Sequence, residues 1–266
     1  MEKIVKHHIF GEILLEKKIR NRNIRIVVNP TNGIRVSLPM FASFDDALRF
    51  VNSKTEELLK IIEKQKILKK KRPFYGEGYD VKILSGAIIF RREMDSQMIK
   101  ISYKYNSTDL YSDNNEFFIF YPKSWPKEIS PNSDEWKILN NGLQKIVRKE
   151  AKRILPNRVL LLSSNMVKKV KSSGILKINI NLLTKINNIS IKNNRTNWGS
   201  CSGKKNINLN MNLLNLPIEL VDYIIMHELC HLIYHDHSQN FHNLLNFFCE
   251  GREKEFIKEI KKYSLN

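Results

Sequence analysis

Apolar and polar residues alternate between residues 10 and 40 of the chain, which is the pattern of strands with one buried face. Residues 24–28 and 34–38 both alternate in this way, and the intervening residues 29–33 include Asn, Pro and Gly. Two alternating runs around turn-forming residues predict a β-hairpin, and its Arg and Ser positions give it one polar, basic face.

Apolar residues at three- and four-residue spacing predict two long helices. The first covers residues 44–71, with Ser43 as its N-cap, and the second covers residues 136 to about 170. Strand-like runs lie at 87–90, 98–102 and 117–120, and two short strands at 189–191 and 207–210 flank a predicted turn at 198–201.

A stretch rich in Pro, Ser and Asn at residues 122–133 separates strand-rich sequence from helix-rich sequence. We place the domain boundary there. The chain then divides into a β-rich, basic N-terminal region of residues 1–132 and a mostly helical domain of residues 133–266 with a small sheet. The predicted fold class is α+β.

A third helix is predicted from Pro217 onward, because proline suits a first helical turn, where its missing N–H costs nothing. Its apolar positions recur at helical spacing and predict a buried helix: Leu220, Val221, Ile224, Ile225, Leu229, Leu232 and Ile233.

His227, Glu228 and His231 lie on this helix in the pattern HExxH. Residues i and i+4 share one helix face, so the two imidazoles can point at one metal ion. Glu228 lies about 100° around the helix from His227, where it is poorly placed as a ligand but can reach a water molecule. Nitrogen ligands, an open position and a neighbouring carboxylate together suit hydrolysis.

We expect the third metal ligand to follow His231 in the sequence. We choose His237, which lies six residues after His231. His235 would share the same face if the helix continued, and His242 could lie on the next helix. Four imidazoles would leave no open position for catalysis, so we expect both to lie outside the ligand set. Glu250 is the carboxylate alternative, although its spacing is not specific.

The net positive charge adds nucleic acid and polyphosphates to the classes of partner that the chain could bind. The 266 residues carry a formal net charge of +18, but residues 191–250 hold four cations and five acids. The positive charge therefore lies outside the segment that carries the histidine cluster. It suits nucleic acid or polyphosphate binding, whereas a Lys- and Asn-rich composition gives a solvated surface without a partner. No aromatic-and-basic nucleic-acid signature accompanies the charge.

The cysteines and the hydropathy predict a cytoplasmic protein without a membrane partner. Cys201, Cys230 and Cys249 form no CxxC pair, and their odd number favours a reducing compartment. Cys230 lies within HExxH but points away from its His face, so we expect a core residue. No apolar run approaches the ~20 residues of a membrane span, and the first residues lack the apolar segment of a secretory signal.

Five motifs in the second half of the chain occur together: NWGSCS at 197–202, INLN at 207–210, DYII at 222–225, HELCHL at 227–232 and HSQNF at 237–241. Together they resemble the YgjP-like family of bacterial metal-dependent hydrolases. Residues 20–39 are similar to the basic opening hairpin of that family, which is more distantly similar to SprT-like and other zincin peptidases. Two departures are His242, where the family has Trp, and the less familiar stretch 85–135.

The resemblance implies a zincin-like domain with His227, His231 and His237 as metal ligands and Glu228 as the general base. We expect one Zn²⁺ per chain, although such sites also take other divalent metals. Asn208 and Asn210 lie on one face of a strand beside the WGSC segment and are candidate substrate-binding residues. An extended substrate can add to such a strand as a further strand.

The resulting hypothesis is a zinc-dependent hydrolase acting on a peptide or protein substrate. One alternative keeps the metal and hydrolyses nucleoside triphosphates as a nucleotide pyrophosphatase. Another alternative, from a different class, is a nucleic-acid-binding protein with a structural metal. Glu228 disfavours it, since a structural site needs no carboxylate near a water molecule.

Overall fold

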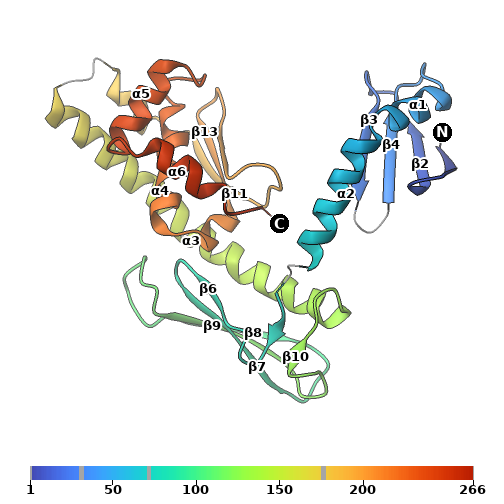
Figure 1. Ribbon diagram of the computed structural model, residues 1–266. Helices are drawn as coiled ribbons and strands as arrows, with labels where there is room; N and C mark the ends of the chain where they lie inside the picture. Colours follow the sequence, from blue (N-terminus) through green and yellow to red (C-terminus); the bar gives the residue numbers. More distant parts are fainter. Residues whose placement is uncertain (1, 30–32, 71–72, 175–177, 266) are drawn as a thin grey trace. The chain divides into compact units, whose positions relative to one another are not determined.

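The computed structural model describes residues 2–29, 33–70, 73–174 and 178–265 (Figure 1). Helices and sheets are mixed, as expected for the α+β class. The chain forms two compact units, Met1–Pro73 and Phe74–Asn266. Each is described by itself below.

The first unit contains a four-stranded sheet in the order β1-β2-β4-β3. Its strands are β1 (Glu2–His7), β2 (Gly11–Lys17), β3 (Arg25–Asn29) and β4 (Gly33–Leu38). β3 and β4 pair in antiparallel fashion, as the predicted hairpin requires, whereas β2 and β4 are parallel. Alternate residues of β2 and β4, such as Ile13, Leu15 and Val36, are fully buried in this unit's own core.

The predicted helix at 44–71 is divided into α1 (Phe44–Ser53) and α2 (Thr55–Lys70). Ser43 caps α1 as expected, because its side chain accepts from the Asp46 N–H while the Asp46 carboxylate accepts from the Ser43 N–H. The break at Lys54 follows from hydroxyl groups beside it. Ser53 and Thr55 donate to the Phe50 and Asn52 carbonyls, a contact that competes with helical bonding.

The second unit begins with a four-stranded sheet in the order β6-β7-β9-β8, together with a two-stranded ribbon. The sheet strands are β6 (Val81–Ile83), β7 (Gly86–Met94), β8 (Lys100–Lys104) and β9 (Asn115–Pro122), and the ribbon pairs β5 (Tyr75–Gly76) with β10 (Glu128–Ile129). The sheet packs against α3 (Asp134–Ser173), the long helix predicted from residue 136.

The unit boundary therefore differs from the predicted one at residues 132–133. Phe90, Phe117 and Ile119 of the sheet share one core with Leu139 and Ile146 of α3. This contact joins strand-rich and helix-rich sequence in one unit. The stretch rich in Pro, Ser and Asn is only a connection inside it.

A second, three-stranded sheet has the order β11-β13-β12, with β11 (Asn188–Lys192), β12 (Gly199–Cys201) and β13 (Asn206–Asn210). The expected turn at 198–201 was wrong, because residues 199–201 form β12, antiparallel to β13. The chain turns at 202–205 instead, where Lys205 adopts a positive φ of 60°. Short 3-10 helices η1 (Ile180–Thr184) and η2 (Met211–Asn215) flank this sheet in the sequence. The chain continues with α4 (Ile218–Cys230), α5 (Gln239–Phe248) and α6 (Glu253–Ile260).

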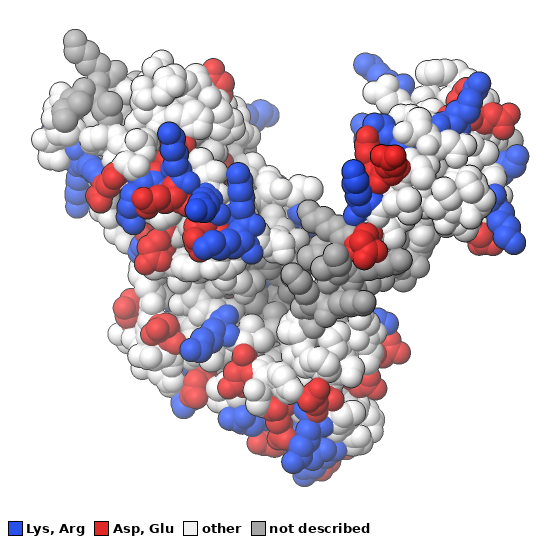
Figure 2. All heavy atoms as spheres, in the orientation of Figure 1, with Lys and Arg blue, Asp and Glu red and all other residues white. Residues whose placement is uncertain are grey.

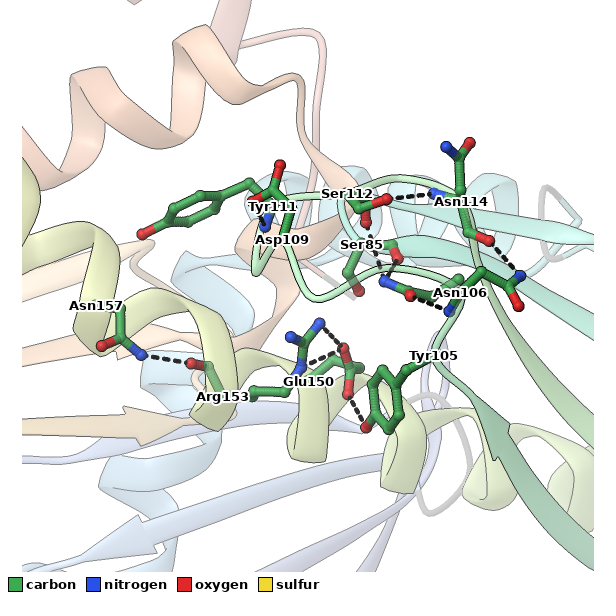
Figure 3. A network of polar contacts seen from close by, with 11 residues as sticks. Ser85, Tyr105, Asn106, Asp109, Tyr111, Ser112, Asn114, Glu150, Arg153 and Asn157 are labelled. Carbon is green, nitrogen blue, oxygen red and sulfur yellow. Dashed lines mark hydrogen bonds and ion pairs between the residues drawn. The ribbon is translucent and has the colours of Figure 1, made fainter.

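A buried polar network ties α3 to the segment after β8 (Figure 3). The Glu150 side chain on α3 is fully buried, and its carboxylate accepts from the Tyr105 hydroxyl (2.8 Å) and from Arg153 (2.7 and 3.0 Å). Burial and the Glu150 contact raise the pKa of Tyr105 to about 12. A buried carboxylate is tolerated here because its oxygens are hydrogen-bonded.

A second polar contact joins α3 to α4. The Arg158 guanidinium donates to both carboxylate oxygens of Asp222, at 2.7 and 2.6 Å, and both side chains are only about one-fifth exposed. Two parallel hydrogen bonds fix orientation as well as distance. This ion pair therefore holds the helix that carries HExxH against the longest helix of the unit.

No helix among the described residues is both long and apolar enough to cross a membrane. On the face shown in Figure 2, Lys and Arg side chains are interspersed with Asp and Glu.

Arg158→Ala should lower the free energy of unfolding of the second unit by roughly 1–3 kcal/mol, because Asp222 loses a charged hydrogen-bond partner in a half-buried position. Urea denaturation followed by Trp fluorescence measures this, since all three Trp residues lie in that unit. Lys137→Ala is the control, because its partner Asp134 is exposed and the pair should contribute under about 1 kcal/mol. Equal urea midpoints for Arg158→Ala and Lys137→Ala would show that the Arg158–Asp222 ion pair does not stabilise the second unit.

Candidate metal centre

The candidate site lies on α4 and on the two segments that follow it. α4 begins directly after Pro217 and buries Val221, Ile225 and Leu229 completely. His227 and Glu228 lie in its last turn, and His231 is its C-cap with helical backbone angles. The helix is thus held rigidly by its apolar side while its last turn presents three polar side chains.

Three imidazoles converge beyond this turn. The ligand atoms of His227, His231 and His237 lie within 4.8 Å of one another. The Nε2 atoms of His227 and His237 are 3.2 Å apart. Two nitrogens bound to Zn²⁺ at tetrahedral angles would be about 3.3 Å apart, so this spacing fits a shared metal ion.

The orientation of each ring is set by groups that are not ligands. His231 Nδ1 lies 3.0 Å from the Tyr234 carbonyl oxygen, to which it can donate, and this leaves Nε2 for a metal. The buried Phe241 ring packs against all three imidazoles, with centroid distances of 4.9 Å to His227, 4.5 Å to His231 and 4.9 Å to His237. Phe241 therefore provides one apolar contact surface that all three imidazoles share.

Burial keeps the cluster in the form that metals bind. Removal from water, with a smaller effect from the neighbouring imidazoles, lowers the pKa of His227 to about 3. Burial also lowers the pKa of His231. Neutral imidazole is the metal-binding form, so both residues are ready to bind a cation without first losing a proton.

Glu228 follows His227 in the last turn of α4 and is almost fully buried. Burial raises its pKa to about 8 in the absence of a cation. Its side chain fills the space above Gly199 on β12. A Cβ atom at residue 199 would lie 2.6 Å from the carboxylate Oε1 and 2.8 Å from Cγ, closer than real contacts allow. Glycine is therefore required there for space, and this explains the tight packing of α4 on β12.

A family model described as the YgjP-like, metallopeptidase domain matches residues 22–262 of this chain. The chain belongs to the YgjP-like family. The match confirms the resemblance inferred from the motifs, and it supports a metal-dependent peptidase. It also extends over the predicted basic hairpin of the first unit.

One similar solved structure is the metallopeptidase zymogen of Pyrococcus abyssi abylysin. It is 23% identical, covers 38% of this chain and 93% of that chain, and has a TM-score of 0.29. A comparison with curated proteins found no match.

The other candidate ligands of the YgjP-like chain lie outside the cluster. His235 is exposed, and Glu250 is exposed and pairs with Lys169. His242 Nδ1 lies 2.7 Å from the buried Glu253 carboxylate, and its ring centroid is 6.3 Å from that of His237. No sequence pattern indicates Glu253, because it lies at the start of a separate helix, α6.

The two candidate substrate-binding amides are engaged within the protein. Asn208 accepts from Ser190 (2.6 Å) and donates to Ser200 (3.2 Å), which links the three strands of the second sheet. Asn210 is fully buried and donates to the Asn194 and Asn197 carbonyls. Both side chains therefore hold the segment that leads into β12.

Burial raises the pKa of the two cysteines near the site, Cys201 and Cys230. Burial and the Glu228 carboxylate raise the pKa of Cys201 to about 11, which keeps its thiol protonated at neutral pH. Cys230 is fully buried, as expected for a core residue.

Gly199→Ala should lower peptidase turnover by about 10- to 100-fold while leaving bound metal unchanged, because the three atoms nearest the added methyl all belong to Glu228, which is not a proposed metal ligand. Turnover and metal content of one preparation measure both effects. Gly203→Ala is the matched control, since a Cβ there meets nothing within 4 Å. Full activity in Gly199→Ala would show that Glu228 does not depend on this contact.

Proposed function

We propose that the protein is a zinc-dependent metallopeptidase in which His227, His231 and His237 hold one Zn²⁺ and Glu228 is the general base. The observation that carries the proposal is the convergence of three imidazoles beside a buried carboxylate. Three nitrogen ligands leave a tetrahedral ion with one open position, the arrangement of catalytic zinc sites. Other divalent metals also fit such a ligand set.

When bound, zinc supplies a Lewis acid that polarises the scissile carbonyl and lowers the pKa of water. Glu228 accepts the proton of the attacking water molecule and passes it to the leaving amine nitrogen. A nearby cation favours the carboxylate form, so the high pKa that burial gives Glu228 falls into a range suited to proton transfer. The Tyr234 carbonyl and Phe241 hold the imidazoles in place during this exchange.

The exposed edge of β12 is the proposed binding edge for an extended peptide. Trp198 and Ser202 bond to β13 through their main chains, so the main-chain groups of Gly199 and Cys201 point away from β13. The Gly199 carbonyl accepts from the Asn197 side chain at 3.0 Å, and a peptide that pairs there would replace this bond. A peptide that pairs with these groups lies beside Glu228. Asn208 and Asn210 then act indirectly, by holding β12 in place.

No feature of the metal centre favours the alternatives of nucleotide hydrolysis or nucleic-acid binding. The segment 191–250 carries more acids than cations, which disfavours a phosphate-rich ligand at the site. A reducing cytoplasm is the proposed compartment, since all three cysteines are free.

Glu228→Gln should lower peptide turnover by about 100- to 10,000-fold, because the amide cannot accept the proton. A peptide library digested with the zinc-loaded protein and read by mass spectrometry measures it. Glu219→Gln, an exposed acid in the first turn of the same helix, is the control and should retain activity. Hydrolysis of nucleoside triphosphates but of no peptide would overturn the assignment in favour of the pyrophosphatase.

A further inference from the structure

Two turns of the chain lie at one end of the sheet in the first unit. β2 and β4 are parallel and end side by side, with Lys17 opposite Leu38. Residues 18–24 then cross over the end of β4 to reach β3, which begins opposite Ser37. The chain after β4 turns at 39–42 before α1 begins (Figure 1). The Lys17 ammonium donates to the Met40 carbonyl at 3.1 Å, so the two turns are in contact.

Three large apolar side chains project from these turns into solvent. Ile19 is 88% exposed, Phe41 is 86% exposed and Met40 is 50% exposed. We call these three residues the apolar tip. Single exposed apolar residues are ordinary, but three on adjoining turns form a patch of the kind that marks an interaction site.

Cations flank Ile19 of the apolar tip along the chain. Residues 17–25 contain Lys17, Lys18, Arg20, Arg22 and Arg25 and no acid. We call this stretch the cationic loop. Lys18, Arg20, Arg22 and Arg25 are exposed. Two acids at this end are themselves paired with cations, Glu16 with Arg35 and with Lys18 of the cationic loop, and Asp46 with Arg49. Asp45 is exposed beside them, so the charge of the surface remains clearly positive.

We propose that the apolar tip and the cationic loop dock the first unit on the surface of an anionic lipid bilayer, which departs from the expectation of no membrane partner because that expectation rested on the lack of a spanning segment. Apolar side chains enter the boundary between headgroups and acyl chains, while the cations of the cationic loop bind the negatively charged headgroups. Stable attachment to a bilayer needs two such signals together. A nucleic acid would account for the cations but not for exposed Ile19 and Met40. The proposal is independent of the metal centre, because it involves only the first unit.

Vesicle flotation with the full chain tests the proposal. The protein should float with equimolar phosphatidylcholine–phosphatidylglycerol vesicles and not with phosphatidylcholine alone. Arg20→Gln/Arg22→Gln should weaken binding roughly 25-fold, at about fivefold for each cation. Ile19→Ser/Phe41→Ser should weaken it about tenfold or more. Ile4→Ser, at an exposed apolar position on β1, and Lys60→Gln, at an exposed cation on α2, are the matched controls and should bind normally.

Phe41→Trp gives a second, direct readout of insertion. The three native Trp residues lie in the second unit, so the new fluorophore is the only Trp of the first unit. Its emission should shift to the blue with anionic vesicles and should be quenched by brominated acyl chains.

Three outcomes would overturn the proposal. Equal binding to neutral vesicles would remove the role of the cations. Vesicle binding without a blue shift at residue 41, or without loss in Ile19→Ser/Phe41→Ser, would remove the role of the apolar tip. Binding to duplex DNA in the absence of any vesicle binding would assign the surface to nucleic acid instead.

Discussion

The candidate metal centre depends on how closely α4 packs against β12. Gly199 lets the Glu228 side chain lie directly on the strand, and a single added carbon atom would occupy the position of the carboxylate. The same helix is fixed on its other side by the Arg158–Asp222 ion pair with α3. The position of the carboxylate relative to the imidazoles therefore follows from packing between three elements that are distant in the sequence.

Burial determines the protonation states around this contact. It lowers the pKa of His227, which keeps a metal-binding imidazole neutral, and it raises the pKa of Glu228 until a cation offsets it. It also raises the pKa of Cys201, which leaves the thiol inactive beside the carboxylate. The same low-dielectric environment thus keeps the histidines neutral, as metal binding requires, and keeps the Cys201 thiol protonated, so the base function is left to Glu228.

The sequence predicted the features that depend on local periodicity. The hairpin of β3 and β4, the cap at Ser43, the long α3 helix and the HExxH helix all follow from repeats of two or of three to four residues. The third histidine could be chosen by spacing because His237 follows the helix end by one short turn. Its assignment as a ligand remains a prediction that the 3.2 Å spacing to His227 supports.

Features that depend on contacts between residues distant in the sequence could not be predicted from the sequence. β12 has three residues, too few to show alternation, so its sequence predicts a turn instead of a strand. The unit boundary was misplaced because the sheet of β6 to β9 shares its core with α3, and composition does not reveal that contact. The pairing of His242 with Glu253 joins two separate helices in the same way.

The measurement that tests this account most directly is the metal content of protein purified without added metal, in wild type, His231→Ala and Glu228→Gln. The account predicts about one zinc per chain in wild type and in Glu228→Gln, and little in His231→Ala, because His231 is a ligand and Glu228 is not. Zinc retained in folded His231→Ala, or absent from all three folded proteins, would contradict the proposed metal centre.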